Sequence, residues 1–298
     1  MSRILVTGGE GFVGSYLIRA LVEDGHEVVS LDIQDGTKLG RRLECERVQY
    51  VVGNTEDIEI IFDDLRFDVI FHLGEYARVE QSRDEPALVF KRNVIGTFQV
   101  VEFWRRTRCR LVYTASSTAF VDEKSGKKGK NLSPYTYWKD VNSNLIQNYG
   151  VWYKLDYAVA YLYNAYGPGE PSEGGYSTLI GKFLKQAREG SKLTVRKPGS
   201  QRRNFTHVQD IADGLRVLVS HSPEEGREPI YRFGSAEHYS ILEVVDMFGL
   251  EFVWLEERPG NRDSVDPMVK GEIPELQWKA TRALREYINM EFLENKLR

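Results

Sequence analysis

Tyr135 and Lys139 are the residues of this 298-residue chain whose types and spacing most directly suggest chemistry. They stand four residues apart in the stretch NLSPYTYWKD, which is typical of the first turn of a helix. Positions i and i+4 are neighbours on one helical face, so the phenol and the ammonium would stack there. Surface helices also carry such pairs, and sixteen tyrosines are expected to produce about one by chance. The spacing alone therefore leaves catalysis and packing both open.

A phenol beside an ammonium can act as a general base. A tyrosine has an ordinary pKa of about 10, and taking a proton from a hydroxyl near neutral pH requires lowering it by about three units, which is worth about 4 kcal/mol. A nearby positive charge supplies such stabilisation because it favours the phenolate over the phenol. Lysine is the residue type that this chemistry needs next to the tyrosine.

Three glycines near the N-terminus indicate a dinucleotide site. The stretch ILVTGGEGFVGSYLIRAL places Gly8, Gly11 and Gly14 directly after an apolar run and into the first helical pattern. Glycines there permit a tight turn, and backbone amides at the helix N-terminus can bind a pyrophosphate. An ordinary tight turn is the alternative.

Asp32 ends the second apolar run and bears on the choice of dinucleotide. A carboxylate at this place can accept both hydroxyls of the adenosine ribose and would repel a 2'-phosphate. Glu10 adds negative charge within the glycine loop, whereas the basic residues Arg41 and Arg42 follow well past the end of the run. These residues predict NAD rather than NADP, although Asp32 could instead cap a turn.

Short apolar runs alternate with helical patterns through the first half of the chain, and these elements must position the residues above. The runs cover residues 3–7, 27–32, 48–52, 68–73, 110–116 and 157–163. Such nearly continuous runs fit strands buried on both faces, and the amphipathic stretches between them fit crossover helices. The pattern predicts an α/β fold with a doubly wound parallel sheet.

The pattern changes at the Gly/Pro-rich stretch AYGPGEPSEGGY. We therefore expect a dinucleotide-binding domain over residues 1–163 and a smaller substrate-binding lobe mainly over 164–298. Part of 205–236 is expected to return to the main sheet.

Composition narrows the class of partner. The net charge is −4, which argues against nucleic acid as the main partner, and the lysine-rich stretch 123–130 reads as a solvated loop. Cys45 and Cys109 lack metal-ligand spacing and are too few for a disulfide framework, which fits a reducing compartment and no metal. The N-terminus does not read as a signal peptide, and no run reads as a membrane span. We expect a cytoplasmic protein without a membrane partner.

Taken in order, the motifs resemble the extended short-chain dehydrogenases/reductases that act on nucleotide sugars, most of all the UDP-galactose 4-epimerase-like branch. The resemblance covers almost the whole chain and is carried by VTGGEGFVGSYL, DVIFHLGEYARVEQS, NVIGTFQVVEF, LVYTASSTAF, SPYTYWKDVNSNLI, YNAYGPGE, PGSQRRNFTHVQDIADGL and ERPGN. It implies a Rossmann-type NAD-binding domain.

The resemblance also implies a catalytic group of Tyr135, Lys139 and Ser116, with Ser117 as the nearest rival of Ser116. In this reading, Tyr135 is the base, and Lys139 stabilises the phenolate and holds the nicotinamide ribose. Ser116 hydrogen-bonds the reacting oxygen.

Further cofactor contacts are implied by position in the family pattern. Core packing is the alternative for the pyrophosphate residues, Ile33 and the inner-wall residues, and a helix-bending polar residue is the alternative for Asn93. The residues are Phe12 and Val13 beside the pyrophosphate, Ile33, Asn54 and Thr55 near adenine, Leu73, Gly74 and Tyr76 along the inner wall, and Asn93 and Tyr163 near the active site.

The nucleotide-sugar contacts that the resemblance implies are Asn164, Leu179, Arg203, Arg258 and Asn261. Arginine forks suit phosphate oxygens, although surface ion pairs are an alternative for each arginine. Asn261 stands where the family usually has aspartate.

The segment GEYARVEQS departs from the family pattern, which prefers small residues at Gly74 and Glu75. Glu75 and Arg78 are expected either to read the hexose or to form a structural pair. His72, within an apolar strand, is expected to be a core histidine.

The residues after the serine bear on the reaction that the resemblance implies. Dehydratases of the family carry an Asp-Glu pair there and decarboxylases a glutamate, whereas this chain has Ser117 and Thr118 and lacks the nearby cysteine of 3,5-epimerising members. The expectation is an NAD-dependent 4-epimerase acting on a nucleotide-diphosphate sugar, with a UDP-sugar favoured by resemblance alone. A 4-reductase or dehydrogenase is the alternative, and a non-catalytic dinucleotide-binding scaffold or sensor is an alternative of another class. The family also implies a homodimer.

Overall fold

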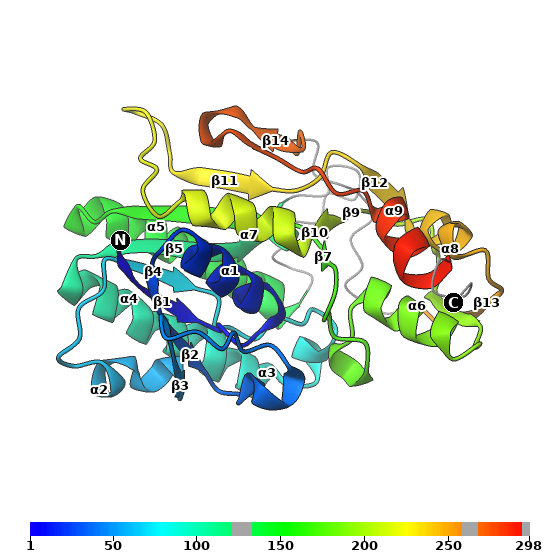
Figure 1. Ribbon diagram of the computed structural model, residues 1–298, viewed down its shortest axis with the longest axis horizontal. Coiled ribbons are helices and arrows are strands. Elements are labelled where there is room, and N and C mark those ends of the chain that lie inside the picture. The colour runs from blue at the N-terminus through cyan, green and yellow to red at the C-terminus, as the bar shows by residue number, and fades with distance from the viewer. Residues whose placement is uncertain (121–132, 258–267, 294–298) are drawn as a thin grey trace.

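The computed structural model describes residues 1–120, 133–257 and 268–293. Its main sheet has seven parallel strands in the order β11-β6-β5-β4-β1-β2-β3 (Figure 1). The strands are β1 (Arg3–Thr7), β2 (Glu27–Asp32), β3 (Val48–Val52), β4 (Val69–His72), β5 (Arg110–Ser116), β6 (Tyr157–Leu162) and β11 (Ile230–Phe233). β1 pairs with both β2 and β4, so the chain order reverses at this strand. The predicted doubly wound parallel sheet is confirmed.

Alternate residues of each central strand enter separate hydrophobic cores, because successive side chains point to opposite faces of a sheet. Leu5 packs in the core beneath α4 (Thr97–Thr107) and α5 (Pro134–Tyr153). Ile4 and Val6 pack in the other core, which α1 (Phe12–Glu23) and α7 (Val208–Val217) cover. Figure 1 shows α1 and α7 side by side on their face of the sheet. Burial on both faces explains why the strands read as continuous apolar runs.

Shorter elements fill the connections of the main sheet. They are α2 (Ile58–Ile61), α3 (Pro86–Val89) and the π-helix η4 (Phe90–Gly96), which leads directly into α4. No helix among residues 1–120, 133–257 and 268–293 is long and apolar enough to cross a membrane.

A smaller group of elements lies at one end of the molecule (Figure 1). It contains the helices α6 (Leu179–Arg188), α8 (Ile241–Phe248) and α9 (Leu284–Ile288), which share a third hydrophobic core. The paired strands here are β8 (Leu193–Arg196) with β13 (Phe252–Leu255), β9 (Arg202–Asn204) with β12 (His238–Ser240), and β7 (Ala165–Tyr166) with β10 (Thr206–His207).

The chain passes from this group back to the main sheet. α7 packs against α1, and β11 pairs in parallel with β6. The short hairpin of β14 (Glu272–Ile273) and β15 (Trp278–Lys279) then packs on the same core as α7.

Candidate active site

The first turn of α5 presents Tyr135 and Lys139 from a well-defined helix start. Ser133 is the N-cap, and its side chain accepts a hydrogen bond from the Thr136 amide at 3.2 Å. Pro134 occupies the first helical position, where its missing N–H costs nothing. Tyr135 and Lys139 are both buried, with 8% and 5% of their surface exposed. The helix therefore holds the pair on its inner face, as their spacing predicted.

Ser116 is the last residue of β5, at the carboxyl edge of the sheet, and is partly exposed. Its Oγ accepts hydrogen bonds from the Thr118 hydroxyl at 2.9 Å and from the Thr118 amide at 3.3 Å. Ser117, its rival from sequence, is buried. The carboxyl edge of a parallel sheet is where such folds bind ligands, so Ser116 is the better placed of the two serines.

Glu75 is the site residue whose partner the sequence did not reveal. Its carboxylate forms a buried ion pair with the Lys139 ammonium, and the same ammonium donates to the Thr114 carbonyl at 2.6 Å. The expected pair of Glu75 with Arg78 is wrong, because the partner lies 64 positions along the chain. An acidic residue three positions after a buried strand was the available signal.

The electrostatics of this cluster favour an ionised Glu75 beside a neutral histidine. Burial acts to raise the pKa of the Glu75 carboxyl, but the Lys139 charge and the hydrogen-bond donors outweigh it and lower the pKa below its ordinary value. Burial lowers the pKa of His72 to about 4. Its ring nitrogens contact the hydroxyls of Thr7 at 2.7 Å and Thr97 at 3.0 Å, so His72 is the hydrogen-bonded core histidine that we expected.

The glycine loop has the shape of a phosphate cradle. Gly8 has φ of +70°, and a Cβ there would meet the backbone of Leu73 and Gly74 at 2.8 Å. A Cβ on Gly14 would collide with the Gly8 carbonyl. Only glycine fits both places, and Gly11 is the N-cap of α1, whose first amides carry the positive end of the helix dipole. These residues fit the pyrophosphate of NAD.

On the adenosine side of the glycine loop, the negative charges have more partners than the sequence suggested. Asp32 accepts hydrogen bonds from the Glu10 and Gln34 amides, each at 3.0 Å. Arg42 forms an ion pair with the Glu10 side chain, and Arg41 donates to the Glu10 carbonyl at 3.4 Å. Both arginines follow well past the end of β2 in sequence, but the chain turns back and brings them to the loop. The charge of Glu10 is therefore paired with Arg42.

The inner wall is positioned by Asn93 from η4. The Asn93 side chain accepts from the Tyr76 amide at 2.6 Å and donates to the Tyr76 carbonyl at 3.0 Å. Its own carbonyl accepts from Asn142 at 2.6 Å. Asn93 thus shapes the segment that follows Leu73 and Gly74, which line the glycine loop.

The remaining predicted cofactor residues differ in accessibility. Phe12 and Val13 are half-buried at the start of α1, Ile33 is half-exposed, Asn54 accepts from Arg92, Thr55 is buried, and Tyr163 is fully buried. Tyr163 therefore belongs to the core behind the site.

The structure brings part of the predicted substrate set together. Asn164 donates to the Asn204 carbonyl at 2.8 Å, which places it next to Arg203 in β9. Leu179 is the first residue of α6. Arg258 and Asn261 lie outside the described residues.

Arg78 is a half-buried cation close to Tyr135, and its Nη1 donates to the Ala77 carbonyl at 2.9 Å. Its Nε is buried without a hydrogen-bond partner in the described part of the chain. The Tyr135, Tyr76 and Tyr176 phenols lie near enough to interact with its charge, and burial lowers the pKa of Arg78. Tyr76 and Tyr176 both donate to Glu85, at 2.5 and 2.8 Å. These hydrogen bonds hold the segment around Tyr176, which belongs to the second lobe, close to Arg78.

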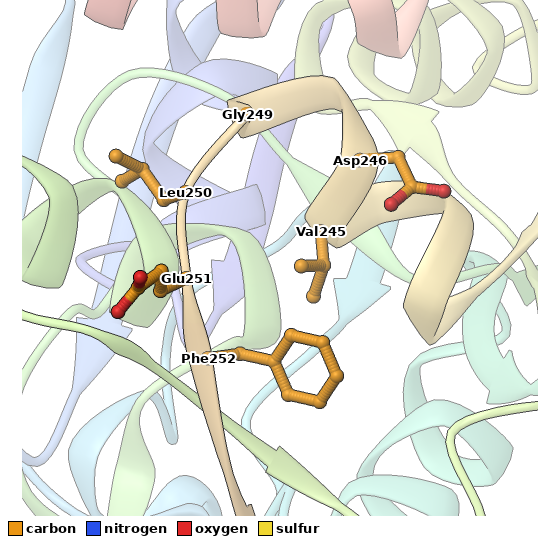
Figure 2. Close-up of a pocket in the computed structure, with 6 residues that line it drawn as sticks. All are labelled: Val245, Asp246, Gly249, Leu250, Glu251 and Phe252. Atoms are coloured by element: carbon orange, nitrogen blue, oxygen red, sulfur yellow. The ribbon is translucent and has the colours of Figure 1, made fainter.

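A surface hollow elsewhere holds none of the predicted site residues. Figure 2 shows it between α8 and β13, lined by Val245, Asp246, Gly249, Leu250, Glu251 and Phe252. Within the described ranges, no three His, Cys, Asp or Glu side chains are grouped to hold a metal ion.

Comparison with known proteins matches this arrangement. Residues 4–234 match the family model described as the NAD dependent epimerase/dehydratase family. The chain is 27% identical over 314 residues to UDP-glucuronic acid decarboxylase 3 of Arabidopsis thaliana, covering 95% of this chain and 86% of the relative. It is 26% identical to a putative UDP-glucose 4-epimerase of Methanocaldococcus jannaschii, covering 96% and 95%.

Among solved structures, the fold is similar to a variant of UDP-glucuronic acid 4-epimerase from Bacillus cereus in complex with UDP-4-deoxy-4-fluoro-glucuronic acid and NAD. The TM-score is 0.86 at 22% identity, and the match covers 99% of each chain.

Proposed function

The chain belongs to the NAD dependent epimerase/dehydratase family, whose cofactor is NAD, and we propose that it is a nucleotide-sugar 4-epimerase. The observation that carries the proposal is the buried Tyr135 and Lys139 pair on α5, with Ser116 at the adjoining edge of the sheet. This is the minimal set of side chains for oxidising and re-reducing one carbon through a transient 4-keto sugar.

Each residue has a defined part in this proposal. Tyr135 takes the proton of the sugar 4-hydroxyl and returns a proton to the reformed hydroxyl. Lys139 stabilises the phenolate by its charge. Ser116 hydrogen-bonds the reacting oxygen. The glycine loop would hold NAD, which would supply the hydride acceptor and donor for C4 of the sugar.

Two observations support a 4-epimerase over the dehydratases and decarboxylases of the family. Ser116 is followed by the hydroxyl residues Ser117 and Thr118, and Thr118 hydrogen-bonds Ser116. The dehydratases and decarboxylases of the family carry carboxylates at these positions, whereas this chain carries hydroxyls. The Tyr135 and Lys139 pair also argues against a purely non-catalytic scaffold.

Decarboxylation of a UDP-hexuronic acid is the second candidate, since several relatives of similar identity are UDP-glucuronic acid decarboxylases. Arg78 adds to it, because its buried Nε has no hydrogen-bond partner among the described residues and lies near Tyr135, where an arginine suits a sugar carboxylate. A 4-keto hexuronic acid is a β-keto acid and loses carbon dioxide readily, so the same site could lead to either product.

The product identifies the reaction. Purified protein is incubated without added cofactor with UDP-glucose, UDP-N-acetylglucosamine and UDP-glucuronic acid, and the products are identified by NMR. The proposal requires a C4 epimer from at least one of them. Formation of a UDP-pentose with carbon dioxide would establish the decarboxylase. Turnover that requires added cofactor in stoichiometric amount would establish the reductase or dehydrogenase, and a lack of turnover of every nucleotide sugar would establish the scaffold.

The proposal includes assembly and location. The helices that contain Asn93 to Trp104 and Tyr135 to Tyr149 would pair across a two-fold axis in a homodimer. Exposed apolar side chains on these elements, among them Ile95, Phe98 and Trp152, support such a contact. A cytoplasmic location is supported by Cys45 and Cys109, which are both free thiols.

A further inference from the structure

Glu75 is a buried carboxylate placed among the residues of the proposed chemistry. It follows β4 by three positions, and only 1% of its side chain is exposed. Besides the Lys139 ammonium, it accepts from Asn142 at 2.8 Å, from Thr97 at 3.0 Å and from the Tyr113 hydroxyl at 3.3 Å. The donors come from α4, α5 and β5, so the carboxylate lies where the sheet meets both helices.

This environment requires an ionised Glu75. A carboxylate offers about four acceptor positions, and four donors occupy them here. A protonated carboxyl would instead have to donate, and an ammonium cannot accept. The lowered pKa of Glu75 agrees with this geometry.

Stability alone gives little reason for the pair. Removing two charges from water costs several kcal/mol per ion, and well-packed apolar residues often replace a buried ion pair without loss of stability. Lys139 is also the residue whose charge the proposed mechanism uses. A counter-charge at this place therefore acts on the chemistry.

We propose that Glu75 is a positioning residue that holds the Lys139 ammonium in place and, by its negative charge, limits how strongly that ammonium stabilises the Tyr135 phenolate. This inference rests on the proposed function only for the role of Tyr135 as base. In this inference, the charge of Glu75 keeps the phenol and phenolate forms of Tyr135 close in free energy, so that Tyr135 can both take and return a proton.

Among the groups described below, which face the Lys139 and Glu75 pair, none other than Glu75 carries a negative charge. Tyr113 from β5 lies under the ammonium, with 4.8 Å from Nζ to the ring centroid, and burial keeps its pKa well above the ordinary value, so it is neutral. His72 from β4 is neutral near pH 7. Thr97 and Asn142 carry no charge, and Arg78 is the second cation near Tyr135.

The test is a titration of the Tyr135 phenol in the enzyme loaded with NAD. Phenolate absorbance is followed against pH, and the curve of the matching Tyr135→Phe protein is subtracted to isolate this one tyrosine. Glu75→Gln removes the charge and keeps the shape. We expect the titration midpoint to move to lower pH by about one unit, because Lys139 is then uncompensated. The acid limb of kcat/KM should move in the same direction.

Two variants separate charge from structure. Glu75→Asp keeps the charge, so its midpoint should stay close to that of the unchanged protein. Glu102→Gln removes a carboxylate from α4 that accepts from Arg105 and Tyr149, away from Lys139, and should leave the midpoint in place. If Glu75→Gln does not fold, Glu75→Ala removes the same charge and leaves room for water.

A midpoint that is unchanged, or that moves to higher pH, in the folded charge-removing variant would overturn the inference. Loss of stability without a shift would show that Glu75 is merely structural. The titration needs no turnover, whereas the proposed function is judged from the NMR product, so the two can fail separately.

Discussion

At the residue scale, Tyr135 works within an arrangement of compensated charge. In the proposed mechanism, Lys139 supplies the positive charge that a phenolate needs, and Glu75, its ion-pair partner, neutralises part of that charge. Because the site excludes water, each of these charges acts more strongly than it would at the surface. In the proposed mechanism, the reactivity of the tyrosine thus depends on Lys139 from the same helix and on Glu75 from the segment after β4.

Replacing Tyr135 with phenylalanine tests its role directly. We expect turnover to fall by at least about 100-fold, because the general base is lost, while NAD stays bound to the glycine loop. Turnover is measured by NMR and bound cofactor by chromatography after denaturation. Tyr137→Phe is the matched control, since Tyr137 lies on the same helix with 45% of its surface exposed. Near-normal turnover of Tyr135→Phe would exclude it as the base.

The sequence predicted the local part of this site better than its long-range part. Ser133, Pro134 and the spacing from Tyr135 to Lys139 are local signals, and α5 begins where they indicate. The contacts of Glu75 with Lys139 and of Arg42 with Glu10 join distant positions. No periodicity encodes which distant charges meet, so those contacts needed the fold.

At the scale of elements, the loop before α6 is held by a buried carboxyl group. Glu170 accepts from the Thr178 hydroxyl and from the Gly167 amide at 3.3 Å. The same loop accepts at Pro168 from the Tyr16 hydroxyl at 2.9 Å and at Gly169 from Arg41 at 2.9 Å. It therefore links the second lobe to α1 and to the segment after β2.

Burial raises the pKa of Glu170 to about 7, which makes this loop sensitive to pH. Because the pKa in the folded state lies above the ordinary value of 4.5, the stabilising contribution is present below about pH 4.5 and is lost as pH rises through about 7. Relative to Glu170→Gln, the free energy of unfolding of the unchanged protein should therefore fall by roughly 2 kcal/mol between pH 5 and pH 8.

Urea unfolding of both proteins at the two pH values measures this difference. Glu173→Gln is the control, because Glu173 lies in the same loop but is exposed, and Lys185 lowers its pKa. The stabilisation by Glu173 is lost only as the pH falls below the ordinary carboxyl pKa. The difference in unfolding free energy between the unchanged protein and Glu173→Gln should therefore stay constant from pH 5 to pH 8. A constant difference for Glu170→Gln as well would exclude Glu170 as the titrating group.

The strands were the elements that the sequence predicted best. The run 110–116 coincides with β5, and 68–73 exceeds β4 by one residue at each end. Buried parallel strands have an unbroken apolar signature, which is easily read. The π-helix η4 was not predicted, because an apolar stretch of this length does not distinguish it from an α-helix.

At the scale of the whole molecule, one face of the main sheet's helical layer remains apolar and exposed. The exposed large apolar side chains on η4, α4 and α5 are Phe90, Ile95, Phe98, Tyr137, Val151, Trp152 and Tyr153. Exposed apolar side chains gathered on neighbouring helices are typical of contact sites between proteins.

We predict a particle of about twice the 34.3 kDa chain mass by light scattering at micromolar concentration. The double variant Ile95→Glu, Phe98→Glu should dissociate it, because like charges would face each other across the two-fold axis. Ile60→Glu, at a residue of α2 with 83% exposure, is the control and should leave the mass unchanged. A monomer mass for the unchanged protein would contradict the homodimer.

The hydrogen on C4 of the sugar provides the most direct test of the proposed 4-epimerase. UDP-glucose, or whichever nucleotide sugar the NMR screen identifies, is deuterated at C4 and converted by the purified protein in ordinary water. We predict an epimer that keeps its deuterium, because the hydrogen that leaves C4 returns to the same carbon within a closed site. In heavy water, unlabelled substrate should gain no deuterium on any ring carbon. Deuterium lost from C4, or solvent deuterium found at C3 or C5, would contradict the proposed mechanism.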